Sequence, residues 1–74
     1  MILKVIKADY ITDYSVKLKF NDGLEKIIDL KKELYGSVFE PLGDKEYFQK
    51  FYIDCNTISW PNGADFAPEY LYEL

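Results

Sequence analysis

Apolar and polar side chains alternate strictly over residues 13–20. The apolar positions are Tyr14, Val16, Leu18 and Phe20, and every residue between them is polar or charged. Successive side chains of a β-strand point to opposite faces of the sheet. The alternation therefore predicts a strand that places one face against a core and leaves the other face in water.

The segments on either side of this strand are typical of an antiparallel meander. Residues 2–10 are rich in β-branched side chains and precede a predicted turn over 11–13. Asn21, Asp22 and Gly23 tolerate the positive φ angles of a short hairpin loop. We therefore expect three antiparallel strands, the last of which carries the apolar residues Leu24, Ile28 and Leu30.

Short helical turns are predicted for the middle of the chain. One or two turns fit residues 31–35, with Gly36 as the residue that ends them. Residues 38–43 read as a tight apolar loop. Asp44 then suits the N-cap of a short helix over 45–50, because its carboxylate can accept a backbone N–H bond.

A second hairpin and a terminal helix are predicted for the last part of the chain. Residues 51–53 and 57–60 are largely apolar segments that flank a short turn. Pro61 ends the second of these strands, and Pro68 suits the first turn of a helix that reaches the end of the chain. Together these elements predict a single α+β domain over residues 1–74.

The ionisable side chains exclude most common catalytic sites. All nine basic residues are lysines, histidine and arginine are absent, and Cys55 is the only cysteine. Histidine is the commonest group for proton transfer near neutral pH, and no neighbouring cation in the sequence would activate the Cys55 thiol. We therefore expect no catalytic residue and no cofactor, and the unpaired cysteine favours the reducing cytoplasm.

Carboxylates could bind a metal ion in two places, but neither place matches a known motif. One is Asp54 with Asn56, and the other is Asn62 with Asp65 and Glu69. Neither has the spacing of an EF-hand loop, and zinc sites need close pairs of histidine and cysteine. We therefore expect no bound metal and assign these residues to turns and helix caps.

The second half of the chain carries a dense run of distinctive motifs. Residues 36–42 read Gly-Ser-Val-Phe-Glu-Pro-Leu, residues 57–65 read Thr-Ile-Ser-Trp-Pro-Asn-Gly-Ala-Asp, and residues 67–69 read Ala-Pro-Glu. With these motifs essentially the whole chain resembles the small bacterial family called domain of unknown function 2442. The resemblance implies a compact α+β fold without an established activity, and an antitoxin-like or modulatory role beside a toxin-like partner. The structural motif residues are Phe39, Pro41, Leu42, Pro61, Gly63 and Pro68.

The loop after Trp60 supports two interpretations. In the structural one, Asn62 and Gly63 make a turn that Trp60 anchors against the core. Asp65 then accepts backbone N–H bonds at the start of the last helix. In the functional one, the loop grips a peptide or a basic side chain. The binding residues would then be Trp60 as anchor, Asn62 as amide contact, and Asp65 and Glu69 as charges.

Charge is distributed unevenly along the chain, whose net charge is −4. Residues 1–37 carry seven lysines and six acids, whereas residues 38–74 carry two lysines and seven acids. An acidic half of this kind repels phosphate and favours a basic protein partner. No apolar run approaches the ~20 residues needed to cross a bilayer, so we expect no membrane partner.

Our leading interpretation is a small non-catalytic interaction protein whose acidic half binds a basic protein. One alternative is a dimeric regulator that binds nucleic acid through a lysine face made of Lys17 and Lys19, with Lys26 as a further candidate. Aromatic surfaces that stack on bases lie in positively charged grooves, so the acidic second half disfavours nucleic-acid binding by the isolated chain. Another alternative is a ligand or enzyme site formed between the subunits of a homo-oligomer.

Overall fold

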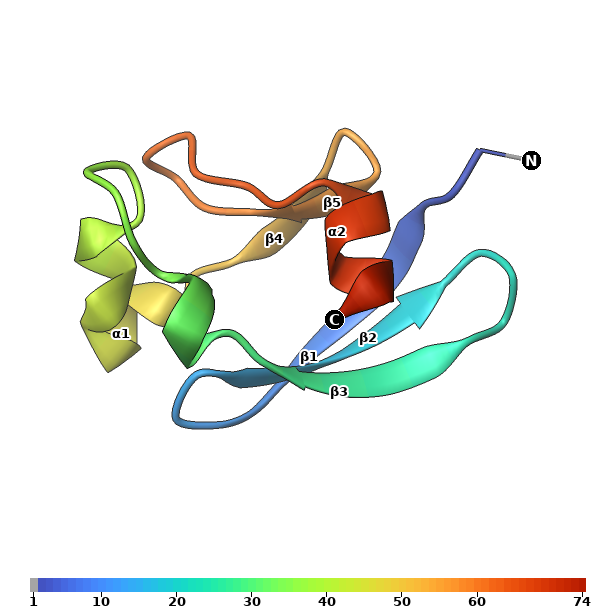
Figure 1. Cartoon of the computed structure of the whole chain (residues 1–74), viewed down its shortest axis with the longest axis horizontal. Coiled ribbons are helices and arrows are strands. Elements are labelled where there is room, and N and C mark those ends of the chain that lie inside the picture. Colours follow the sequence, from blue (N-terminus) through green and yellow to red (C-terminus); the bar gives the residue numbers. More distant parts are fainter. Residues whose placement is uncertain (1) are drawn as a thin grey trace.

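The computed structural model describes residues 2–74, which form two small sheets and several short helices. Figure 1 shows the three-stranded sheet on one side of the molecule and a hairpin on the other, with α1 near one end. This architecture confirms the predicted α+β class. In chain order the elements are β1 (Val5–Thr12), β2 (Ser15–Phe20), β3 (Glu25–Asp29), the 3-10 helices η1 (Lys31–Glu33) and η2 (Glu40–Gly43), α1 (Lys45–Phe48), β4 (Tyr52–Asp54), β5 (Thr57–Ser59) and α2 (Pro68–Glu73).

β2 confirms the strand predicted from the alternating pattern. Val16, Leu18 and Phe20 are fully buried, whereas Lys17 between them is exposed. β2 is the central strand of the first sheet and pairs antiparallel with β1 and with β3. One face of the meander therefore packs on the core and the other faces solvent, as expected for an antiparallel sheet.

Two details of the meander differ from the expectation. β1 continues to Thr12, and the turn begins at Asp13 instead of spanning residues 11–13. Asp13 takes a φ of 47°, a left-handed conformation that aspartate tolerates better than most residues, and the strand can therefore run on. Leu24 lies before β3 and not in it, because its N–H donates to Asp22 Oδ1 (2.9 Å) within the turn.

The middle of the chain forms three short helical segments. η1 and the following Gly36, whose φ is 90°, fit the predicted helical turn and its stop. The prediction of a plain loop over 38–43 is wrong, because η2 forms there and buries Leu42. Asp44 caps α1 as predicted, with its Oδ1 accepting from Glu46 N–H at 3.0 Å. α1 is shorter than predicted because the chain turns after it toward β4.

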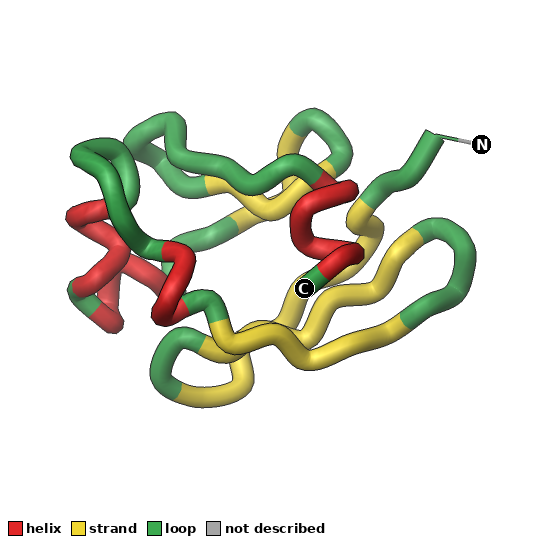
Figure 2. The backbone as a smooth tube through the Cα atoms, viewed as in Figure 1, coloured by secondary structure: helices red, strands yellow, loops and turns green. Residues whose placement is uncertain are grey.

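The second predicted hairpin is confirmed as β4 and β5. Cys55 and Asn56 form its turn with φ angles of 49° and 68°, the positive values that a tight hairpin turn requires. Val5 N–H donates to the Asn56 carbonyl oxygen (2.9 Å) and joins the hairpin to β1. A long loop then leads to α2, which begins at Pro68 as predicted (Figure 2).

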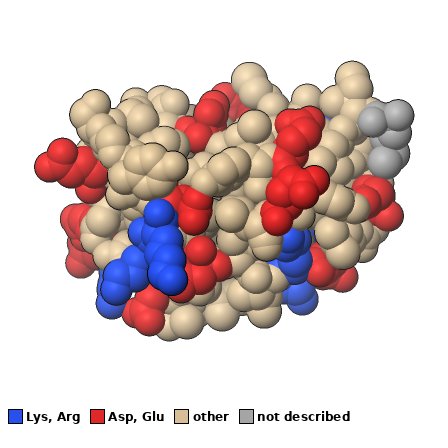
Figure 3. Space-filling view, in the orientation of Figure 1, with Lys and Arg blue, Asp and Glu red and all other residues tan. Residues whose placement is uncertain are grey.

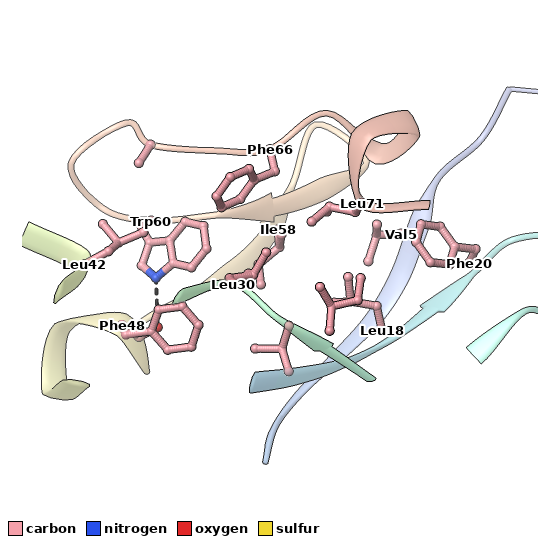
Figure 4. Close-up of a cluster of buried hydrophobic side chains, with 13 residues drawn as sticks. Val5, Leu18, Phe20, Leu30, Leu42, Phe48, Ile58, Trp60, Phe66 and Leu71 are labelled. Carbon is pink, nitrogen blue, oxygen red and sulfur yellow. Dashed lines mark hydrogen bonds between the residues drawn. The ribbon is translucent and has the colours of Figure 1, made fainter. Parts of the chain in front are cut away.

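Buried apolar side chains from both sheets and from the helices form one core cluster (Figure 4). Every buried side-chain nitrogen or oxygen in residues 2–74 has a hydrogen-bond partner, so the core carries no unsatisfied polar side chain there. Its members are Val5, Val16, Leu18, Phe20, Ile28, Leu30, Leu42, Phe48, Ile58, Trp60, Ala64, Phe66 and Leu71.

Candidate functional site

Trp60 lies in the centre of the core and not on the surface. Its side chain is fully buried, and its Nε1–H donates to the Phe48 carbonyl oxygen at 2.8 Å (Figure 4). The Trp60 ring also packs edge-on against Phe66, with centroids 5.9 Å apart. The residue therefore anchors the following loop, as the structural interpretation predicts, and leaves no exposed surface for a partner.

Asn62 uses its side-chain amide within the chain. Its Oδ1 accepts from the Ala64 N–H at 3.1 Å, and its Nδ2 donates to the Val38 carbonyl oxygen at 2.8 Å. Gly63 follows with a φ of 91°, which glycine adopts without strain. Asn62 and Gly63 thus form the predicted turn, and the amide of Asn62 ties this turn to the segment that precedes η2.

Replacing Asn62 with alanine is expected to lower the free energy of unfolding by about 1–2 kcal/mol, because two side-chain hydrogen bonds are lost. Denaturant unfolding followed by circular dichroism measures the change. Gln49→Ala is the matched control, since the Gln49 amide donates only within its own helix, to Lys45 O. Equal stabilities for the Asn62 and Gln49 variants would show that the Asn62 link contributes nothing specific.

Asp65 does not cap the last helix, so that part of the structural interpretation is wrong. The N-cap of α2 is Ala67, which makes no side-chain capping bond. The backbone of Asp65 instead forms a bridge with Ser59, and this pairing holds it before the first turn of α2. Its carboxylate is therefore left at the surface, as is that of Glu69 in the first turn of α2.

The exposed carboxylate of Asp65 borders a shallow groove with an aromatic floor, which we call the aromatic groove. The groove encloses about 330 Å³ and is lined mostly by apolar surface. The Phe39 and Phe66 rings stack with centroids 4.7 Å apart, and the Phe66 and Tyr70 rings stack at 5.9 Å and are nearly parallel. Its main lining residues are Glu33, Tyr35, Phe39, Asp65, Phe66 and Tyr70.

Two carboxylates flank the aromatic groove without a neutralising lysine. The ion pairs present in residues 2–74 join Lys7 to Asp9, Lys17 to Glu25 and Lys45 to Asp13. None of them involves an acid of the aromatic groove. The charge of the groove is therefore open to a cation from outside the chain.

Sequence reasoning identified Asp65 but missed Glu33 and Tyr70 as members of one site. The Tyr70 hydroxyl donates to Glu33 Oε1, although the two residues are 37 positions apart in the sequence. Phe39 was assigned only a structural place, and it also forms part of the groove floor. No local pattern links these positions, because the fold of the whole chain brings them together.

The hydrogen bond from Tyr70 to Glu33 raises the pKa of the Tyr70 phenol to about 12, with burial of the hydroxyl and the Glu33 charge as smaller causes. An unfolded tyrosine has a pKa of about 10. The native state thus holds the Tyr70 proton more tightly than the unfolded state, and this contribution to stability is present below about pH 10 and disappears as the pH rises through 12.

Replacing Glu33 with glutamine is expected to lower the pKa of Tyr70 toward the ordinary value of about 10, because a neutral amide stabilises the phenol proton less. Carbon-13 NMR of the tyrosine Cζ atoms, recorded against pH, measures the change. Glu69→Gln is the control and should leave Tyr70 unchanged. A native protein in which Tyr70 titrates at its ordinary pKa would contradict this account.

The remaining motif residues have structural positions. Leu42 is fully buried in η2, whereas Pro61 is exposed after β5. Pro41 and Pro68 lie in the first turns of η2 and α2. The backbone nitrogen there has no hydrogen-bond partner within the helix, so proline, which lacks an N–H, costs no hydrogen bond.

Of the lysines considered as a nucleic-acid face, Lys26 does not share the face of Lys17 and Lys19. Lys26 pairs in register with buried Leu18, and its Nζ donates to the Tyr72 carbonyl oxygen at 2.8 Å on the α2 side of the sheet. Lys17 points to the other face, where it lies 3.5 Å from Glu25. The outward face of the meander therefore carries Lys17 and Lys19 without Lys26.

A second cavity of about 400 Å³ is polar and lies near the first turn of the meander. It contains both signs of charge, and Lys45 Nζ lies 2.9 Å from Asp13 Oδ1 across it. In residues 2–74 no three acidic or cysteine side chains are close enough to hold a metal ion.

Residues 5–74 match the family model described as Protein of unknown function (DUF2442). The match covers nearly the whole chain, so the chain belongs to this family. No curated protein and no solved structure matches the sequence of this chain. The helices found between residues 2 and 74 are all too short or too polar to cross a membrane.

Proposed function

We propose that this protein is a small non-catalytic interaction module that binds a basic protein through the aromatic groove. The observation that carries the proposal is the pair of carboxylates, Glu33 and Asp65, which border an aromatic floor and form no ion pair within residues 2–74. Aromatic side chains contribute much of the binding energy of protein interfaces. Charges at the rim steer a partner of opposite charge and set its orientation.

The charge of the surrounding surface supports a basic partner. In the view of Figure 3, acidic atoms lie on and around α2, and basic atoms gather in two groups lower on the same face. Glu69 and Glu73 belong to α2, which contains no lysine. A negatively charged surface repels nucleic-acid phosphates, so the proposal assigns the groove to a protein and not to DNA or RNA.

The proposal includes no catalytic role and places the protein in the cytoplasm. The absence of histidine and arginine from the sequence supports the first point. The single cysteine, Cys55, is exposed and has no partner for a disulfide within the chain, which supports a reducing compartment. A small toxin-like protein, as the family resemblance implies, is one basic partner that the proposal would accommodate.

The double variant Asp65→Lys, Glu69→Lys is expected to lose its basic partner, because it reverses one exposed charge that lines the groove and another in the first turn of α2, the helix that carries Tyr70. Tagged protein is incubated with host lysate at moderate salt, and captured proteins are identified by mass spectrometry. The matched control is Glu46→Lys, Asp54→Lys, which reverses two exposed acids outside the groove. Circular dichroism confirms that each variant is folded.

We expect the wild type and the control to retain a stoichiometric basic partner and the groove variant to lose it. A folded groove variant that still holds the partner would refute the proposal. Capture of no basic partner, with elution as a homo-oligomer, would also refute it and would favour a ligand site between subunits.

A further inference from the structure

We infer that the aromatic groove binds the guanidinium group of an arginine side chain, with the planar cation stacked on the ring surface and its N–H groups directed at the flanking carboxylates. The inference rests on the proposed function for the existence of a protein partner. The chemistry of the groove can nevertheless be tested without that partner.

The shape of the groove floor favours a planar cation. Phe39 and Tyr70 each stack on the Phe66 ring, with ring planes 23° and 6° from it. Phe66 is only 6% exposed, so the aromatic surface open to a ligand is mostly that of Tyr70, which is 41% exposed. Tyr35 adds an aromatic side chain at the edge and is 71% exposed. Guanidinium is flat and weakly hydrated and stacks on aromatic faces, whereas the lysine ammonium is compact and strongly hydrated.

The polar atoms of the groove are acceptors that a guanidinium can satisfy. Glu33 Oε1 accepts from the Tyr70 hydroxyl, which fixes the carboxylate at the groove edge. Within residues 2–74, Glu33 Oε2 and both carboxylate oxygens of Asp65 accept no hydrogen bond from a side chain. A guanidinium carries five N–H donors and no acceptor, so it complements carboxylates on the rim of an apolar floor.

Other kinds of occupant fit the groove less well. A phosphate or a carboxylate ligand would be repelled by Glu33 and Asp65. A neutral apolar side chain would cover the rings but would remove water from two carboxylates without replacing their hydrogen bonds. An arginine satisfies both requirements at once, because its aliphatic stem and planar head cover the rings while its charge pairs with the acids.

The test is a titration of nitrogen-15-labelled protein with N-acetyl-arginine methylamide, followed by NMR. The corresponding lysine compound carries the positive charge but no guanidinium. The citrulline compound has a planar head group of similar shape but no charge. We expect saturable shifts confined to the groove, at Tyr35, Phe66, Ala67 and Tyr70. Affinity should fall about threefold or more for lysine, because ammonium stacks less well, and should vanish for citrulline.

Two variants remove charge while keeping side-chain shape. Glu33→Gln retains an acceptor for the Tyr70 hydroxyl, and Asp65→Asn leaves the backbone bridge to Ser59 in place. Each should weaken arginine binding by about two- to fivefold, the range for an exposed charge pair. Asp54→Asn, which removes an acid outside the groove, should have no effect.

The inference is overturned by the absence of saturable groove shifts, by equal binding of the lysine compound, or by equal losses of arginine affinity in the groove variants and in Asp54→Asn.

Failure of this inference is distinct from failure of the proposed function. A partner lost on charge reversal, without arginine binding, would leave the interaction module in place and remove only the arginine. Arginine binding without a charge-dependent partner would leave the groove chemistry in place and remove the interaction role.

Discussion

Replacement of Trp60 by alanine is expected to remove most of the protein's free energy of unfolding at room temperature. The indole is fully buried between Phe48 and Phe66 and donates its only hydrogen bond to the Phe48 carbonyl oxygen. Truncating a buried tryptophan costs about 3–5 kcal/mol. Small domains have a total stability of about 5 kcal/mol, because a short chain buries a smaller share of its surface.

Far-ultraviolet circular dichroism and urea unfolding measure the effect of the Trp60 substitution. The matched control is Tyr52→Ala, which removes an aromatic side chain that is 46% exposed on β4 and should cost about 1 kcal/mol or less. A Trp60→Ala protein that unfolds at the same urea concentration as the control would contradict the central position assigned to the indole.

Replacement of Leu71 by alanine is expected to lower the free energy of unfolding by about 2–5 kcal/mol, the range for a buried leucine. Leu71 is the buried residue of α2, and Figure 4 shows it pointing toward Ile58 and Val5. α2 has six residues, and an isolated helix of that length is unstable in water. The helix therefore depends on this contact and on the packing of Tyr72 against Phe20, whose ring centroids are 5.0 Å apart.

The Leu71 substitution should also weaken ligand binding in the aromatic groove, because α2 carries Tyr70. Urea unfolding gives the loss of stability, and NMR titration with N-acetyl-arginine methylamide gives the loss of binding in the folded fraction. The control is Glu73→Ala, an exposed change in the same helix, which should alter stability by no more than about 0.5 kcal/mol. A Leu71 variant as stable as this control would show that α2 does not depend on its buried leucine.

These two substitutions change buried residues that hold the groove in shape, and they leave the residues that would contact a ligand unchanged. Trp60 and Leu71 are buried and reach no partner, yet they hold the segments that carry Phe66 and Tyr70. Asp65 contributes little to folding by comparison, because an exposed charge changes stability by about 1 kcal/mol or less. Glu33 is half-buried and accepts a hydrogen bond from Tyr70, so it serves both the fold and the groove. Substitution of Trp60 or Leu71 should therefore lower both stability and binding, whereas Asp65→Asn should lower binding alone.

Much of the secondary structure was predictable because its signals are local. The alternation of Val16, Leu18 and Phe20 identifies β2, since a strand exposes its two faces with a period of two residues. Asp44 and Pro68 identify the starts of α1 and α2, because capping and a fixed φ act within one turn. Each of these features depends on residues that are neighbours in the sequence.

The errors fall where tertiary contacts compete with local preference. η2 replaces a predicted loop where Leu42 enters the core. Aspartate is a residue type suited to a helix N-cap, so Asp65 was predicted to cap the last helix. Its backbone pairs with Ser59 instead, and Ala67 begins the helix without a side-chain cap. Lys26 was grouped with outward lysines, although the register of β3 turns it toward α2.

The amino-acid sequence alone was sufficient for the α+β class, the central strand, the helix starts and the acidic character of the second half, because these follow from neighbouring residues and from composition. The aromatic groove required the folded chain. Glu33, Phe39, Asp65 and Tyr70 come from four separate segments, and hydrophobic burial places those segments side by side without leaving a periodic mark at the exposed positions.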